Sequence, residues 1–209
     1  MFLETIKRKY RPGCPILVGD ILLMFPNFTK AYVFRLLNKA LESKEITRVS
    51  RGVYCVTGKT VLGYYTPSSR TVAERKYVCN QDDVFGVVSG LSLLNSFAVI
   101  SQVPNDLEIV TNKEKTRRRE IRIRGMNFVL RKSRFQITKE NVKYYIVLQL
   151  FLEINKGFYL DDTSKSLIKD FIKRNKLRNE LMMQYALAFP QSVTQSLIKS
   201  GVIYGTTQA

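Results

Sequence analysis

The sequence of 209 residues contains no histidine. Without histidine the chain has no imidazole to act as a general acid or base, no Ser-His triad and no histidine metal ligand. A Gly-rich phosphate-binding loop of the P-loop type is also missing. These absences exclude several large enzyme classes, and we expect no catalytic residue, no metal and no cofactor.

Cysteine is scarce as well, because only Cys14, Cys55 and Cys79 are present and they form no CxxC pair. An odd number of widely spaced cysteines excludes a disulfide framework and gives no zinc signature. The sequence also has no long hydrophobic run: its longest mostly apolar stretch, 86–100, is too short to span a bilayer. Because Glu4 follows the start so closely, we expect no signal peptide, no membrane segment and a cytoplasmic location.

Acidic residues are few, with 17 Asp and Glu against 34 Lys and Arg, so the formal net charge is +17. A field of that sign attracts polyanions, which makes nucleic acid or an acidic protein surface the first partner to consider. The alternative is a basic surface that serves solubility alone.

The N-terminal part has the pattern of two helices followed by a hairpin. An apolar helix over 18–25 ends before Pro26, and Thr29 is a suitable N-cap for a helix that runs to about Lys44. Two β-rich runs, 46–49 and 53–56, then flank a turn that contains Gly52. This order predicts a winged helix-turn-helix, and Pro67 and the serines after it mark a linker. We therefore expect a DNA-binding domain over residues 1–68.

The second of these helices is amphipathic. Its apolar positions follow the i, i+3, i+4, i+7, i+8 pattern and are Val33, Leu36, Leu37, Ala40 and Leu41. At about 100° per residue, the opposite side carries Arg35 and Asn38, which have the hydrogen-bonding geometry to read base edges in a major groove. The full predicted DNA contact set, including the wing, is Thr29, Lys30, Tyr32, Arg35, Asn38, Lys39, Arg48, Ser50 and Arg51.

Residues 69–209 predict a second, mixed domain with a small sheet and C-terminal helices, so the fold class is α+β. We expect a helix over 87–97, a strand over 107–111, and a hairpin from 121–124 and 128–132 around Gly125-Met126-Asn127. The segment 142–154 is apolar nearly all round and predicts a central buried helix, and three amphipathic helices follow it.

The second domain also contains the most basic segment, in which ten Lys and Arg lie between Lys113 and Arg134 and only Glu114 and Glu120 oppose them. Alternation with isoleucines predicts that Arg122 and Arg124 share one face of a strand. This second basic surface would bind either DNA or a partner protein. The alternative is that it is a solvated basic hairpin with no binding role. Its predicted members are Lys113, Lys115, Arg117, Arg118, Arg119, Arg122, Arg124 and Arg131.

The run Leu36–Tyr54, with its leucine-rich helix, short basic wing and closing Arg51-Gly52-Val53-Tyr54, resembles the winged helix of AbiEi-type antitoxins. Further on, Gly90–Phe97 and Ser101–Asn105 resemble the small-residue helix and the Ser/Thr-Gln-Val-Pro segment of their second domain. The resemblance covers most of residues 15–155.

This resemblance implies a two-domain antitoxin of a type IV toxin–antitoxin pair that acts in bacterial defence against phage. It implies repression of its own operon through an inverted-repeat operator in duplex DNA, and a C-terminal domain that counters a nucleotidyltransferase toxin. We expect a monomer or weak dimer that binds DNA cooperatively.

Two other classes remain open from the residues alone. A metal-dependent nuclease site is one of them, because its acidic and basic residue types occur together in Asp106, Glu108, Glu114 and Lys115. Acids that alternate along a strand, however, more often form an exposed face. The other class is a protein-interaction module that docks an acidic partner and does not bind DNA.

Overall fold

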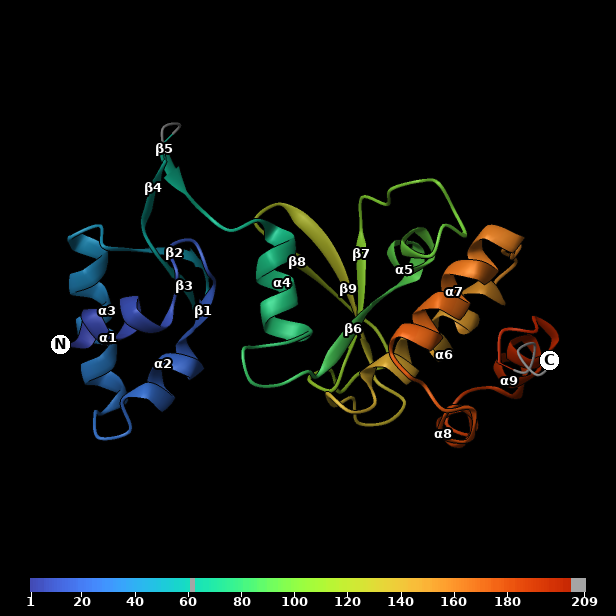
Figure 1. Cartoon of the computed structure of the whole chain (residues 1–209). Helices are drawn as coiled ribbons and strands as arrows, with labels where there is room; N and C mark the ends of the chain where they lie inside the picture. The colour runs from blue at the N-terminus through green and yellow to red at the C-terminus, as the bar shows by residue number, and fades with distance from the viewer. Residues whose placement is uncertain (61–62, 204–209) are drawn as a thin grey trace. The chain divides into compact units, whose positions relative to one another are not determined.

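The computed structural model describes residues 1–60 and 63–203 and shows an α+β protein (Figure 1). By their internal contacts, these residues form two compact units. The first unit comprises Met1–Lys76 and Ile123–Gly125, and the second comprises Tyr77–Arg122 and the chain from Met126 onward. The sequence predicted a boundary after residue 68, and the contacts divide the chain after Lys76 instead, which leaves most of the helix over Ser69–Tyr77 in the first unit.

The first unit confirms both predicted helices and the predicted hairpin, and it adds elements that the sequence pattern did not predict. Its elements in chain order are α1 (Phe2–Lys9), β1 (Ile16–Leu17), α2 (Val18–Met24), α3 (Lys30–Glu42), β2 (Ile46–Ser50), β3 (Val53–Val56), β4 (Gly58–Thr60), β5 (Gly63–Tyr65) and α4 (Ser69–Tyr77) (Figure 1).

Strands β1, β2 and β3 form one antiparallel sheet in the order β1-β3-β2. Ile16 pairs with Tyr54 and Ile46 pairs with Val56, so the short strand before α2 completes the sheet on the far side of β3. Gly52 has a φ of 71°, a left-handed conformation that only glycine adopts at little cost, and this allows the tight turn of the hairpin.

The core of the first unit lies between α1, α3 and this sheet. Of the predicted helix stripe, Val33 and Leu37 are fully buried and Ala40 is buried, whereas Leu36 and Leu41 are only half-buried. Tyr54 is 4% exposed and packs into the same core. Ile6 of α1 is buried in this core, and so is Tyr10, the residue with extended backbone geometry that ends the helix.

The second unit is built on a four-stranded sheet in the order β6-β7-β9-β8. Strands β6 and β7 are antiparallel, β7 and β9 are parallel with Ile109 opposite Leu130, and a turn joins β8 to β9. The elements are β6 (Gly86–Ser89), α5 (Gly90–Ser96), β7 (Leu107–Thr111), β8 (Arg119–Ile123), β9 (Met126–Lys132), α6 (Val142–Ile154), α7 (Asp162–Arg174), α8 (Asn179–Ala186) and α9 (Gln191–Lys199).

The predicted helix over 87–97 is wrong in its first three residues. Val87, Val88 and Ser89 belong to β6 and pair with β7, and the helix starts only at Gly90. A short apolar run of small residues has no periodicity that separates strand from helix, and pairing with the distant 107–111 segment decides the outcome. The predicted strand over 107–111 is confirmed. The predicted hairpin is present, but its strands are 119–123 and 126–132 and its turn is Arg124-Gly125, so Met126 and Asn127 belong to a strand.

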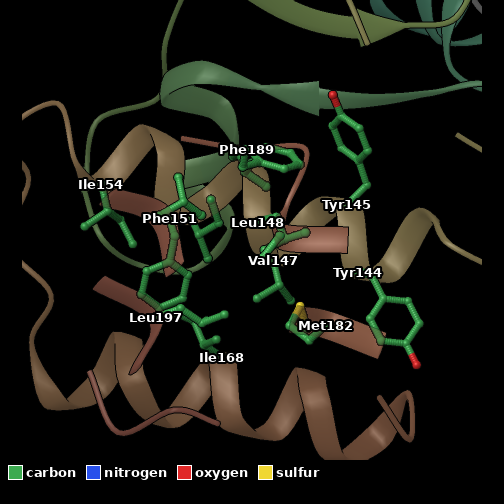
Figure 2. Packing of buried hydrophobic residues seen from close by; sticks show 14 of the residues in the cluster. Tyr144, Tyr145, Val147, Leu148, Phe151, Ile154, Ile168, Met182, Phe189 and Leu197 are labelled. Atoms are coloured by element: carbon green, nitrogen blue, oxygen red, sulfur yellow. The ribbon is translucent and has the colours of Figure 1, made fainter. Parts of the chain in front are cut away.

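Helix α6 is the centre of the second core, as its apolar sequence predicted. Figure 2 shows side chains of α6, among them Val147 and Phe151, gathered with Ile168 of α7, Met182 of α8 and Leu197 of α9. All five side chains are at most 1% exposed. The three predicted C-terminal helices are thus confirmed, and their apolar stripes cover α6.

Among the residues described, no helix has both the length and the apolar character that crossing a bilayer requires.

Candidate nucleic-acid interface

Helix α3 presents a polar face whose start is fixed by a hydrogen bond. The Thr29 hydroxyl accepts from the backbone N–H of Tyr32 at 3.2 Å, so Thr29 is the N-cap that its position in the sequence predicted. Beyond this cap, the side chains on the outer side of the helix are all exposed. The predicted members of this side are Lys30, Ala31, Tyr32, Arg35, Asn38 and Lys39, and the acid Glu42 is exposed on the same side at the end of the helix. The predicted outward set of this helix is therefore confirmed as solvent-facing.

A row of aromatic rings leads from α1 to the exposed face of α3. Phe2 contacts Phe25 with ring centroids 4.6 Å apart, Phe25 stacks on Phe28 at 5.5 Å, and Phe28 meets Tyr32 edge-on at 5.0 Å. The Arg35 guanidinium then lies over the Tyr32 ring, 4.9 Å from its centroid. Stacking of this kind holds an arginine extended while its N–H groups stay available to a ligand.

The β2–β3 hairpin carries two further exposed cations, Arg48 and Arg51. The strand pairing shifts between Arg48 and Ser50, a bulge that changes the direction of side chains near the hairpin tip. Ser50, which the sequence placed in the contact set, has its Oγ buried and without a hydrogen-bond partner among the described residues. That hydroxyl therefore does not face solvent beside the two arginines.

The cations of this face are not neutralised by any acid in the part of the chain that the structure describes. Among the described residues none of them forms an ion pair, although the first unit has carboxylates. Three of those carboxylates are paired elsewhere: Glu45 with Lys7 at 2.6 Å, Glu74 with Arg70 at 2.9 Å, and Asp20 with Arg75 at 2.8 Å. We call the set of unpaired cations on α3 and the hairpin the α3–wing face; its members are Lys30, Arg35, Lys39, Arg48 and Arg51.

The second basic surface differs, because three of its arginines have acidic partners inside the second unit. Arg118 pairs with Glu120 at 2.7 Å, and Arg131 donates to Glu108 at 2.8 Å. Arg119 donates to Glu114 at 2.7 Å. The charge counted from the sequence is thus partly compensated in three dimensions.

Glu114 is the most buried acid of this region, with its side chain 4% exposed. Burial alone raises the pKa of Glu114, but hydrogen bonds from the Thr116 backbone N–H at 3.0 Å and hydroxyl at 2.8 Å, together with Arg119, outweigh it and lower the pKa to about 2. Glu114 therefore stays ionised and fixes the loop that leads into β8.

The remaining members of the second basic surface are arranged differently from the prediction. Arg122 is exposed on β8, but Arg124 lies beyond the strand, in the turn, with a φ of 48°, next to Gly125 at 87°. Two consecutive positive φ values make a type I′ turn, so these arginines do not share a strand face as predicted. Arg124 donates to the Pro67 carbonyl instead. Lys115 and Arg117 are exposed, and the ammonium of Lys113 lies 3.5 Å from the centroid of the Phe85 ring.

With this geometry in hand, a comparison with family models gives one assignment. The model described as "Family of unknown function (DUF6088)" matches residues 2–180, which includes both units up to the start of α8. The chain belongs to the DUF6088 family. Among curated proteins, no match to the chain is found.

In this DUF6088 chain two of the three acids considered for a nuclease are held by basic side chains. Glu108 is bound by Arg131 and Glu114 by Arg119, while Asp106 is exposed. Within residues 1–60 and 63–203 no three His, Cys, Asp or Glu side chains group closely enough to hold a metal ion. The arrangement offers arginine–carboxylate pairs that stabilise the loop and sheet.

The DUF6088 chain also uses residues near its α3–wing face that the sequence analysis missed. Phe28 supports Tyr32 from outside the helix, and Phe2 and Phe25 extend the row inward. The spacing of Phe28 and Tyr32, four positions apart across the N-cap, is the signal that could have indicated this contact. Phe28 thus contacts the ring on which the Arg35 guanidinium lies.

Proposed function

We propose that this protein is a regulator that binds duplex DNA through its first unit. The element order α1-β1-α2-α3-β2-β3, with the sheet order β1-β3-β2, supports its assignment as a winged helix-turn-helix. In that arrangement α3 is the recognition helix, which enters the major groove, and the β2–β3 hairpin is the wing.

The single observation that carries this proposal is the uncompensated charge of the α3–wing face. Five cations project from one helix and the adjoining hairpin without a carboxylate partner among the described residues, against one exposed acid on the same helix, Glu42, while three other acids of the first unit pair with cations elsewhere. Gathering like charges costs free energy, and a polyanion that approaches this face lowers that cost. Phosphates spaced along a duplex meet this requirement.

The side chains of the face divide into two roles. Arg35 and Asn38 are able to form bidentate hydrogen bonds with base edges, arginine with guanine and asparagine with adenine. Lys30, Lys39 and the Tyr32 hydroxyl suit phosphates, which fix position without reading sequence. Arg48 and Arg51 on the wing would meet the backbone or minor groove beside the helix.

The resemblance to AbiEi-type antitoxins extends the proposal to a biological role. The protein would be a cytoplasmic autorepressor of its own operon, binding an inverted repeat as a monomer or weak dimer with cooperativity. It would also counter a nucleotidyltransferase toxin through the second unit. A neighbouring reading frame that encodes such an enzyme, and rescue of growth when both proteins are produced, would test this part separately.

The DNA proposal is tested by the salt dependence of binding to a 30-base-pair duplex. If the five cations each displace a counterion, the slope of log affinity against log salt should be about −4 to −5. The variant Lys30→Ser/Lys39→Ser should reduce the magnitude of that slope by about two. Arg8→Ser/Arg11→Ser removes two exposed cations from the segment around α1 and serves as the matched control, with an unchanged slope.

Selection from a random-sequence duplex library should then enrich a motif with inverted symmetry. A slope near zero, or equal effects of the two double variants, would contradict the proposal. An acidic protein that binds the same face while duplex DNA does not would instead favour the interaction-module alternative.

A further inference from the structure

The second unit contains a cavity of about 480 Å³ that the DNA proposal does not use. It lies between the sheet strands β7 and β9 on one side and α6 on the other, and its lining is strongly basic. The cationic side chains that line it are Arg117, Arg131, Lys132, Arg134 and Lys156. We infer that this cavity binds a small organic phosphate of nucleotide size.

The charge balance of the cavity supports an anionic ligand. Two of the lining cations are neutralised, Lys156 by Glu153 and Arg131 by Glu108. Arg117, Lys132 and Arg134 have no carboxylate partner within the described residues, and all three are exposed. Three uncompensated cations that converge on one concave surface raise the local potential, because low-dielectric walls focus the field.

The floor of the cavity is polar but already satisfied. Glu153, 3% exposed, accepts from Gln149 at 2.8 Å and from the Ser89 hydroxyl at 3.2 Å, and its other oxygen binds Lys156. The Tyr145 hydroxyl accepts from the backbone N–H of Arg134 at 3.0 Å. The one acid in the lining is thus shielded, so an incoming anion meets guanidinium and ammonium groups instead of a free carboxylate.

The size and remaining walls define the ligand further. A cavity of this volume falls in the range of small-molecule sites and exceeds what a lone phosphate fills. Arginines bind phosphate oxygens through two parallel hydrogen bonds, which suits Arg117 and Arg134 at the rim. Val110 and Leu152 supply an apolar wall for an organic group attached to the phosphates. The proposal is independent of DNA binding by the first unit.

The test is calorimetric titration of the full-length protein with each of the four ribonucleoside triphosphates and with inorganic triphosphate. At least one nucleotide should bind with a Kd below about 1 mM and more tightly than inorganic triphosphate, because only a nucleotide uses the apolar wall. The variant Lys132→Ser/Arg134→Ser should raise the Kd of that nucleotide at least tenfold. Lys139→Ser/Lys199→Ser, which removes exposed cations of the second unit outside the cavity, should leave binding unchanged.

Arg134 also lies over the Phe189 ring at 5.2 Å, so its loss could disturb packing. Arg117→Glu provides a second variant, because Arg117 is exposed. Reversing its charge should abolish nucleotide binding without a change in the packing of the core. No measurable nucleotide binding, or equal binding by all variants, overturns the inference. The inference is also overturned if duplex DNA displaces the nucleotide from the wild-type protein and Arg117→Glu abolishes the binding of that DNA. That result would assign the cavity to the DNA-binding surface.

Discussion

The guanidinium of Arg75 on α4 donates a hydrogen bond to the carboxylate of Asp20 on α2 at 2.8 Å, across 55 positions of sequence. Both side chains are largely buried, at 10% and 21% exposure, and Arg75 also lies 5.9 Å from the centroid of the Tyr10 ring. This contact attaches α4 to the first unit, although the sequence around residue 68 has the composition of a linker. The first unit is therefore larger than its predicted winged helix.

Asp20→Asn removes the charge that faces Arg75 and leaves a poorly solvated cation without its partner. We expect the free energy of unfolding to fall by about 1–3 kcal/mol, below the cost of breaking a fully buried pair because both groups keep some contact with water. Urea unfolding followed by circular dichroism measures the change. Glu74→Gln breaks the exposed pair with Arg70 and should cost less than about 1 kcal/mol. Equal losses in the two variants would contradict this reading.

Glu114→Gln should reveal how strongly the buried carboxylate stabilises the second unit. The pKa of Glu114 is lowered to about 2, below its ordinary value of 4.5, so the stabilisation is complete above pH 4.5 and is lost as the pH falls toward 2. At pH 7 the variant should be less stable by about 1.5–3 kcal/mol, the usual contribution of hydrogen bonds to a charged group.

The stability difference between wild type and Glu114→Gln should shrink as the pH is lowered from 4.5 to 3 in thermal unfolding experiments. Glu120→Gln, at a side chain 67% exposed, is the control and should change little at any pH. A difference that stays constant across this pH range would be inconsistent with the lowered pKa.

Arg35→Ala and Lys39→Ala separate sequence reading from phosphate binding in the proposed complex. Arg35→Ala should cost on the order of 1–3 kcal/mol for the selected sequence and relax the base preference at one position. Lys39→Ala should weaken selected and random duplexes alike and reduce the salt slope by about one. Fluorescence anisotropy with both duplexes measures the two effects, and an Arg35→Ala loss that is equal for both duplexes would rule out base reading by Arg35.

Gly86→Ala tests the close packing at the start of β6. A Cβ there would lie 2.1 Å from the carbonyl oxygen of Tyr77 and 2.8 Å from that of Val110, both backbone atoms that cannot turn aside. We expect a loss of about 1–3 kcal/mol in the free energy of unfolding. Gly19→Ala meets nothing within 4 Å on α2 and, because alanine is the better helix former, should be neutral or stabilising by up to about 1 kcal/mol. A Gly86→Ala protein as stable as Gly19→Ala would show that this contact relaxes freely.

The sequence by itself determined the elements whose signals are local. The stripe of Val33 and Leu37, the cap at Thr29 and the turn at Gly52 each depend on a few neighbouring residues, and the structure has all of them. The all-round apolar character of 142–154 likewise predicted a buried helix before any partner was known. Periodicity and capping are properties of a single segment, which is why they can be read in one dimension.

Only the tertiary structure decided how the strands pair and which charged side chains form ion pairs. Val87 and Val88 are strand residues because β7 lies beside them. Arg119 and Arg131 are ion-paired because Glu114 and Glu108 lie within hydrogen-bonding distance. The α3–wing cations, by contrast, have no ion-pair partner within residues 1–60 and 63–203. Pairing depends on distances between residues far apart in the chain, and a count of charges along the sequence contains no such distances.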